Sequence, residues 1–126
     1  MKILLADDQR DVRLGLKVIL EQQPGLKVVA ETAASSELMK DLTKARPDII
    51  LLDWELPGLN IYNIVLDLHS ICPEIKIIAL SGKPESEKDA LKRGADAFVC
   101  KCDQPEKLIE AISEVCAKGG MANAVN

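Results

Sequence analysis

Five polar residues of this sequence stand at the ends of short apolar runs. Asp7 and Asp8 follow one run, Asp53 ends a second, and Ser81 and Lys101 follow two more. Continuous apolar runs bounded by turn residues are typical of strands buried on both faces of a parallel sheet. The carboxyl ends of such strands form the edge at which open α/β sheets bind ligands. We therefore expect these side chains to meet in one polar site, with Asp53 as its reactive group.

The three aspartates predict a bound cation, because carboxylates placed close together repel one another unless a proton or a metal ion lies among them. Oxygen ligands with room for water molecules suit Mg²⁺. We expect Asp8 and Asp53 to be direct ligands and Asp7 to act through a water molecule. The backbone carbonyl of Glu55 is expected to supply a further oxygen.

An aspartate carboxylate beside a metal ion is also suited to accept a phosphoryl group as an aspartyl phosphate. Such a transfer needs mainly positioning and positive charge, and Lys101 would supply the charge while Ser81 donates a hydroxyl. Glu55 and Lys83 are expected to pair across the mouth of the site, over the phosphoryl group, and to hinder attacking water. Each residue alone also has a structural explanation, as a helix cap, a turn or a surface lysine. Their shared placement at strand ends favours the site.

Hydrophobic periodicity predicts five strands that alternate with five helices. The expected strands are 2–6, 26–31, 48–53, 75–80 and 97–100, and the expected helices lie within 9–23, 35–46, 60–71, 85–93 and 103–117. This alternation indicates a doubly wound α/β fold of the flavodoxin-like kind, in which right-handed crossovers favour the parallel strand order 2-1-3-4-5. Strands 1, 3, 4 and 5 are then neighbours, so their polar ends line one crevice.

Composition limits the classes of function. The chain has 126 residues, 48% of them hydrophobic and 29% charged, which indicates one globular domain with a sizeable core. A net charge of -4 argues against direct contact with nucleic acid or an anionic membrane. No apolar run approaches the roughly 20 residues of a membrane span, and the N-terminus lacks the layout of a signal peptide. We expect a cytoplasmic protein.

Cysteine and aromatic residues give weaker signals. The four cysteines, Cys72, Cys100, Cys102 and Cys116, are expected to be reduced and to pack as small apolar side chains. A lone C-x-C pair at 100–102, without a second pair, is a weak indication of a metal site. Trp54 and Tyr62 flank the site loop, where we expect exposed aromatic side chains.

Several separated motifs give the chain a family resemblance over residues 2–117. They are Leu4–Asp8, Leu51–Asp53 with Leu56–Gly58, Ala79–Ser81 and Gly94–Lys101. With these motifs the chain resembles the CheY-like receiver domain of two-component response regulators. The stretches 12–16 and 24–31 look most like receivers joined to LuxR/NarL-type DNA-binding domains.

The resemblance implies a function and its partners. A histidine kinase or phosphotransfer protein would donate the phosphoryl group to Asp53, with Mg²⁺ required. Ser81 would then move toward the phosphoryl group and Phe98 would turn inward, which switches an output surface. The receiver would occupy 1–117 and control transcription through an attached DNA-binding domain, with 118–126 as a tail or the start of a linker. It would be a signalling switch rather than an enzyme, and homodimerisation is left open.

Four residues depart from the family pattern. Cys102 stands where a proline with a cis peptide bond is usual, Ile61 replaces a glycine, Gly82 an alanine and Phe98 a tyrosine. They support an alternative, a degenerate receiver that acts by phosphate-independent protein contact and binds Mg²⁺ poorly. A second alternative is a phosphatase with Asp53 as nucleophile, but a chain of this length leaves no room for a substrate-enclosing cap.

Overall fold

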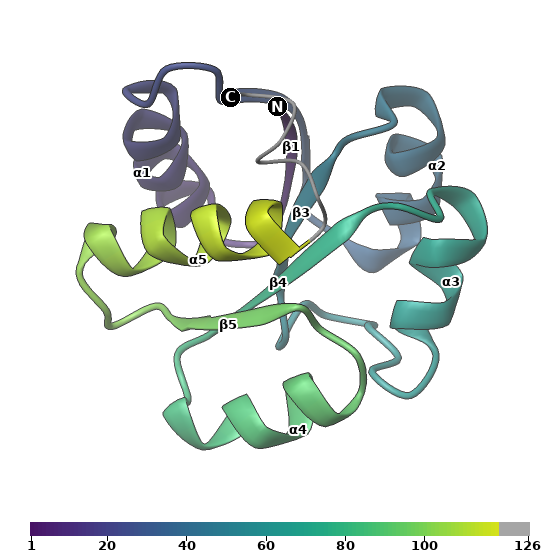
Figure 1. Cartoon of the computed structure of the whole chain (residues 1–126). Helices are drawn as coiled ribbons and strands as arrows, with labels where there is room; N and C mark the ends of the chain where they lie inside the picture. The colour runs from purple at the N-terminus through teal and green to yellow at the C-terminus, as the bar shows by residue number, and fades with distance from the viewer. Residues whose placement is uncertain (119–126) are drawn as a thin grey trace.

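The structure is a computed structural model that describes residues 1–118. Its strands are β1 (Lys2–Ala6), β2 (Lys27–Thr32), β3 (Ile49–Asp53), β4 (Lys76–Ser81) and β5 (Ala97–Cys100). Its helices are α1 (Arg10–Glu21), α2 (Ser35–Ala45), α3 (Ile64–Ile71), the 3-10 turn η1 (Pro84–Ser86), α4 (Glu87–Lys92) and α5 (Pro105–Lys118). All neighbouring strands are parallel, in the order β2-β1-β3-β4-β5. The predicted fold class and strand order are confirmed (Figure 1).

Strand β3 lies at the centre of the sheet because every one of its side chains is apolar except the last. It pairs with β1 on one side and β4 on the other. All five of its residues are buried, including Asp53 at its carboxyl end. A run of this kind cannot be placed at a solvated edge without exposing large aliphatic side chains. Asp53 is therefore placed at the sheet edge by a strand that is buried along its whole length.

Two separate cores cover the two faces of the sheet, since successive side chains of a strand point to opposite faces. On one face Ile50 and Leu52 of β3 pack with buried side chains of α2, α3 and α4. On the other face Ile49 and Leu51 pack with α1 and α5. Figure 1 shows α1 and α5 together on one side of the sheet, and α2, α3 and α4 around the other.

The beginning of α3 differs from the sequence prediction. The expected helix at 60–71 begins only at Ile64. Asn60 does not cap it; its side-chain Oδ1 accepts the backbone N–H of Tyr62 at 3.0 Å. Asparagine competes with a helix by such local hydrogen bonds, so residues 60–63 form a turn.

Helix α2 and the helical segment 85–93 agree with the sequence prediction only in part. Helix α2 has Ala34 at its N-cap and no side-chain cap, so neither Ser35 nor Ser36 caps it. The segment 85–93 divides into η1 and α4. Gly94 follows the C-cap of α4 with a φ of +110°, a left-handed conformation that favours glycine.

The described residues include only part of the region around the expected C-terminal boundary of the domain. Helix α5 runs to Lys118, one residue beyond the expected boundary at 117. The rest of the expected tail, 119–126, lies outside the described residues. Within residues 1–118, every helix is too short or too polar to cross a membrane.

Candidate functional site

The ends of β1, β3 and β5 bring two carboxylates and one ammonium group together. The Lys101 Nζ lies 2.7 Å from Oδ2 of Asp7 and 3.3 Å from Oδ2 of Asp53. Asp7 and Asp53 are only 1% and 2% exposed. Lys101 reaches them from the loop after β5 and is itself 19% exposed. The sequence prediction that these three residues meet at one edge is confirmed.

Backbone hydrogen bonds fix both carboxylates. The backbone N–H of Gln9 donates to Asp7 Oδ1 at 2.8 Å, and the backbone N–H of Glu55 donates to Asp53 Oδ1 at 2.9 Å. The Gln9 side chain also accepts from Lys101 Nζ at 3.3 Å. Each carboxylate therefore has one oxygen held by the loop that follows its strand, and its other oxygen is directed toward Lys101.

Burial and charge act against each other in this group. Burial raises the pKa of Asp53, and the charge of Asp7 raises it further, while the Glu55 N–H and Lys101 oppose the rise. For Lys101, burial lowers the pKa, but hydrogen bonding and attraction to Asp7 and Asp53 outweigh burial and leave the pKa raised. Lys101 is thus held as a cation between two carboxylates that repel one another.

The acidic cluster fits a hard divalent cation. Ligand oxygens of Asp7, Asp8 and Asp53 all lie within 4.8 Å of one another. Asp7 Oδ2 is buried, and the Lys101 ammonium 2.7 Å away is its partner. Asp8 is exposed and closes the cluster on the solvent side. Carboxylate oxygens beside solvent are the donor set that Mg²⁺ prefers.

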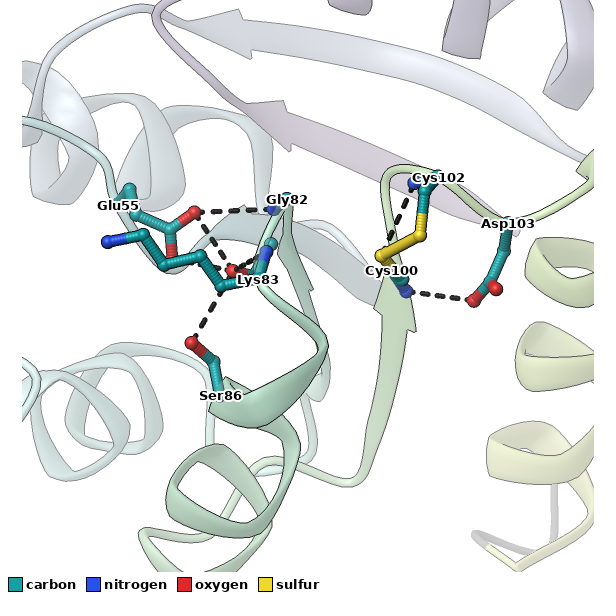
Figure 2. Close-up of a disulfide and its surroundings, with 8 residues drawn as sticks. Glu55, Gly82, Lys83, Ser86, Cys100, Cys102 and Asp103 are labelled. Carbon is teal, nitrogen blue, oxygen red and sulfur yellow. Dashed lines mark hydrogen bonds between the residues drawn. A yellow bond between two sulfur atoms is a disulfide. The ribbon is translucent and has the colours of Figure 1, made fainter.

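Ser81 lies at the same edge and is bound to Glu55. Figure 2 shows Glu55 beside the loop that contains Gly82 and Lys83. The Ser81 Oγ donates to Oε2 of the Glu55 carboxylate at 2.7 Å, and the Gly82 backbone N–H donates to Oε1 of the same carboxylate at 3.3 Å. The Lys83 backbone N–H donates to Ser81 Oγ at 2.9 Å. Ser81 is fully buried, so its hydroxyl needs an acceptor inside the protein.

Glu55 and Lys83 form no ion pair in the part of the chain that the structure describes, and their pairing over a bound phosphoryl group stays a prediction. The Glu55 carboxylate is engaged by Ser81 and Gly82 instead. Both side chains are exposed, and an exposed pair gains little from its own attraction. Hydrogen bonds to a buried hydroxyl and a backbone N–H therefore prevail.

Trp54 and Phe98 link the site to the helices. The prediction that Trp54 is exposed was wrong: it is 7% exposed, and its Nε1 donates to Asp89 of α4 at 3.3 Å. Tyr62 is 72% exposed, as expected, and the Arg93 guanidinium stacks on its ring at 4.3 Å. Phe98 is partly buried against the core on the α2, α3 and α4 face. The sequence did not predict the Trp54–Asp89 contact, because residue type alone does not show which way the indole after a strand points.

The cysteines beside Lys101 also differ from the prediction. Cys100 and Cys102 form a disulfide with a Cα–Cα distance of 5.1 Å, whereas Cys72 and Cys116 are free as expected. A pair two residues apart was weighed only as a weak metal signal. All peptide bonds of residues 1–118 are trans, so the Lys101–Cys102 bond is trans.

The two remaining departures from the family pattern are accommodated without disturbing the acidic cluster. Ile61 packs partly buried against the core that contains α3. A Cβ added at Gly82 would meet no atom within 4 Å, so open space and not a steric contact surrounds this glycine.

Comparisons with known proteins show the family to which the chain is similar. The sequence model of the response regulator receiver domain matches residues 3–113. The chain is 33% identical over 117 residues to the nitrate/nitrite response regulator protein NarL of Escherichia coli, covering 91% of this chain and 54% of that protein. It is 30% identical over 116 residues to the chemotaxis protein CheY of Thermotoga maritima, covering 90% of this chain and 96% of CheY.

A solved structure shows the same fold. The two-component response regulator of the LuxR family from Aurantimonas sp. SI85-9A1 superposes with a TM-score of 0.83 at 28% identity, covering 93% of this chain and 85% of that one. The chain spans about half the length of NarL, the curated relative described above. The aspartate cluster, the lysine after β5 and these likenesses lead to one conclusion: the chain belongs to the response regulator receiver domain family.

Proposed function

We propose that this domain accepts a phosphoryl group on Asp53 from a histidine kinase or phosphotransfer protein, with Mg²⁺ as cofactor. The observation that carries the proposal is the Lys101 ammonium held 3.3 Å from a buried Asp53 carboxylate. An Asp53 oxygen would attack phosphorus while the bond from phosphorus to the donor nitrogen breaks. Lys101 would offset the charge of the incoming group, which transfer of this kind requires.

The acidic cluster would hold the metal ion. Asp8 and Asp53 would bind Mg²⁺ directly, Asp7 through a water molecule, and the Glu55 backbone carbonyl would complete the protein ligands. The bound ion would neutralise charge on the phosphoryl oxygens. The grouping of the three carboxylates, whose oxygens lie within 4.8 Å of one another, supports this assignment.

Ser81 and Phe98 would convert the chemical event into a change of surface. The Ser81 hydroxyl donates to the Glu55 carboxylate in the present state. A phosphoryl group on Asp53 offers a competing acceptor of higher charge, and charge-assisted hydrogen bonds are the stronger ones. Ser81 would leave Glu55 for the phosphoryl group, and Phe98 would turn inward and alter the face formed by α4, β5 and α5.

The wider role follows from the relatives. NarL is a nitrate/nitrite response regulator about twice as long as this chain. We infer a cytoplasmic signalling domain that controls transcription through an attached DNA-binding domain and makes no direct contact with DNA itself. Homodimerisation would be one means of transmitting the signal.

The decisive experiment is the intact mass of the protein after incubation with a small-molecule phosphodonor, with and without Mg²⁺. We expect a Mg²⁺-dependent gain of one phosphoryl group in the wild type and in Asp67→Ala, which alters an exposed aspartate of α3. Asp53→Ala should gain none. Absence of any gain in the wild type would refute the proposal and favour a phosphate-independent receiver.

A second variant tests the role of Glu55. Glu55→Ala removes the acceptor that now engages Ser81, so Ser81 becomes free to bind the phosphoryl group. A net hydrogen bond of about 1 kcal/mol predicts a phosphorylation rate about fivefold higher. Lys83→Ala is the matched control, because the Lys83 side chain makes no ion pair with Glu55 in the described structure, and its rate should equal that of the wild type. Equal rates for both variants would contradict the role of Glu55.

A further inference from the structure

The site lysine is enclosed by a feature that phosphoryl transfer does not use. Cys100 and Cys102 flank Lys101 and are joined by a disulfide across it. Cys100 is the buried last residue of β5, whereas Cys102 is exposed on the loop. Figure 2 shows this bridge at the end of β5, with Asp103 beside it. One sulfur is thus anchored in the sheet and the other is accessible to solvent.

Hydrogen bonds hold the anchored half independently of the bridge. The Cys100 N–H donates to Asp103 Oδ2 at 3.0 Å, and the Asp103 N–H donates to the Cys100 carbonyl at 2.9 Å. The Lys101 N–H donates to the Ser81 carbonyl at 2.8 Å. Opening the bridge would therefore leave the strand end in place and free the part of the loop that contains Cys102.

We propose that Cys100 and Cys102 form a thiol–disulfide exchange site for low-molecular-weight thiols and disulfides, and that its redox state sets how firmly Lys101 is held against Asp7 and Asp53. The proposal rests on the proposed function of Asp53 as phosphoryl acceptor. The oxidised form is the one better prepared for phosphorylation, because the ring through residues 100–102 restricts the backbone that carries Lys101.

The exchange proceeds in two balanced steps. A thiolate of the small thiol attacks the exposed Cys102 sulfur, a mixed disulfide forms, and Cys100 leaves as a thiolate that takes up a proton. A second thiol, as its thiolate, attacks the small-molecule sulfur of the mixed disulfide. This releases the Cys102 thiolate, which takes up a proton, and one molecule of oxidised small disulfide. Two electrons pass from two thiols to the protein, and the reverse sequence restores the bridge.

Exchange suits this pair better than metal binding. A zinc site needs three or four protein ligands in all, such as cysteine and histidine side chains. Within residues 1–118 the ligand group that is gathered is the acidic cluster of Asp7, Asp8 and Asp53, with neither cysteine in it. A bridge with one exposed sulfur is open to attack by thiolates, since exchange depends on access to the attacked sulfur.

The first experiment tests the redox couple itself. The protein is equilibrated with mixtures of reduced and oxidised glutathione, quenched with acid, denatured and alkylated, and its intact mass is measured. The wild type has four cysteines, two of them free in the structure, so the number of alkyl groups should move between four and two as the mixture becomes oxidising. Cys100→Ser/Cys102→Ser should carry two throughout. A wild type that carries four in every mixture would overturn the proposal.

The second experiment tests the link to Lys101. Phosphorylation by a small-molecule donor is timed in oxidising and reducing mixtures at a Mg²⁺ concentration that saturates both states. Fixing one residue's backbone then predicts a rate roughly fivefold or more higher when oxidised. Cys100→Ser/Cys102→Ser is the control, and its phosphorylation rate should be the same in the oxidising and the reducing mixtures. Equal wild-type rates in the two states would overturn the link but leave the proposed function intact.

A readout without phosphorylation separates the two proposals. Mg²⁺ affinity is measured by the fluorescence of Trp54, the single tryptophan, which follows Asp53 in sequence. A firmly held Lys101 competes with the cation for the carboxylates, so the oxidised protein should bind Mg²⁺ more weakly. If Asp53 gains no phosphoryl group in any state, the proposed function fails. A difference in Mg²⁺ affinity between the redox states still supports the inference, and equal affinities overturn it.

Discussion

Replacing Lys101 by methionine should destabilise the protein, because it leaves Asp7 and Asp53 as buried carboxylates without a cation. Both carboxylates are almost fully buried, and Lys101 lies within 2.7 and 3.3 Å of them. Removing one partner of a buried ion pair costs roughly 3–5 kcal/mol. Lys101 is 19% exposed, so we expect the lower end, about 3 kcal/mol. Methionine keeps the apolar stem, so the loss reflects charge.

Urea unfolding measures this loss. With a denaturant slope of about 2 kcal/mol per molar, the unfolding midpoint of Lys101→Met should fall by about 1.5 M. Without the lysine, one of the groups that oppose the rise is lost, so the pKa of Asp53 rises further in the folded state above that in the unfolded chain. The folded variant then binds protons that the unfolded chain releases, so its stability falls as pH rises above about 4. The deficit relative to the wild type should therefore be smaller at pH 5 than at pH 8.

Two further variants make the test specific. Asp53→Asn in the Lys101→Met background removes one uncompensated charge and should recover part of the lost stability. Lys107→Met breaks a surface pair with Glu110, whose Nζ and Oε2 are 3.7 Å apart and whose side chains are more than half exposed, so its midpoint should match that of the wild type. A Lys101→Met midpoint equal to that of the wild type, or a deficit that does not change with pH, would refute the reasoning.

Three other outcomes are expected. Burial raises the pKa of Asp53. As pH is lowered, its phosphorylation rate, corrected for the donor's own pH dependence, should therefore reach half of its maximum at a pH above the ordinary carboxyl pKa of about 3.9. A half-maximal rate at or below that pH would contradict the shift. Gly94→Ala should cost about 1–2 kcal/mol in urea unfolding, because Gly94 has φ of +110° and its Cβ would lie 3.0 Å from Val65 Cγ1. Leu52→Ala, at a fully buried position, should cost about 2–5 kcal/mol, whereas a loss below 1 kcal/mol would indicate unexpected collapse of the core.

The strands and the acidic cluster could be predicted from the sequence because their causes are local or periodic. An apolar run such as Ile49–Leu52 has one stable place, inside a sheet covered on both faces. Once the strand order follows from the handedness of the crossovers, the residues at the strand ends must share an edge. Asp7, Asp53 and Lys101 were therefore found without knowledge of any contact.

The contacts made by loops could not be predicted in the same way. Glu55 binds Ser81 rather than Lys83, and this choice depends on the relative positions of two loops. Trp54 turns inward to Asp89 of α4, a residue 35 positions away in the sequence. Likewise, whether two cysteines separated by one residue are joined depends on how the end of β5 turns, which residue types alone do not fix.

The separation of the two cores by the sheet has a consequence for how such a domain can diversify. Substitutions in α1 and α5 change the packing of one core, and substitutions in α2, α3 and α4 change the packing of the other core. A lineage could therefore remodel one helical layer to recognise a new partner while the opposite layer keeps its shape. Chimeras that exchange α1 and α5 together between relatives should fold more readily than chimeras that exchange α4 and α5, because the second exchange cuts through both layers.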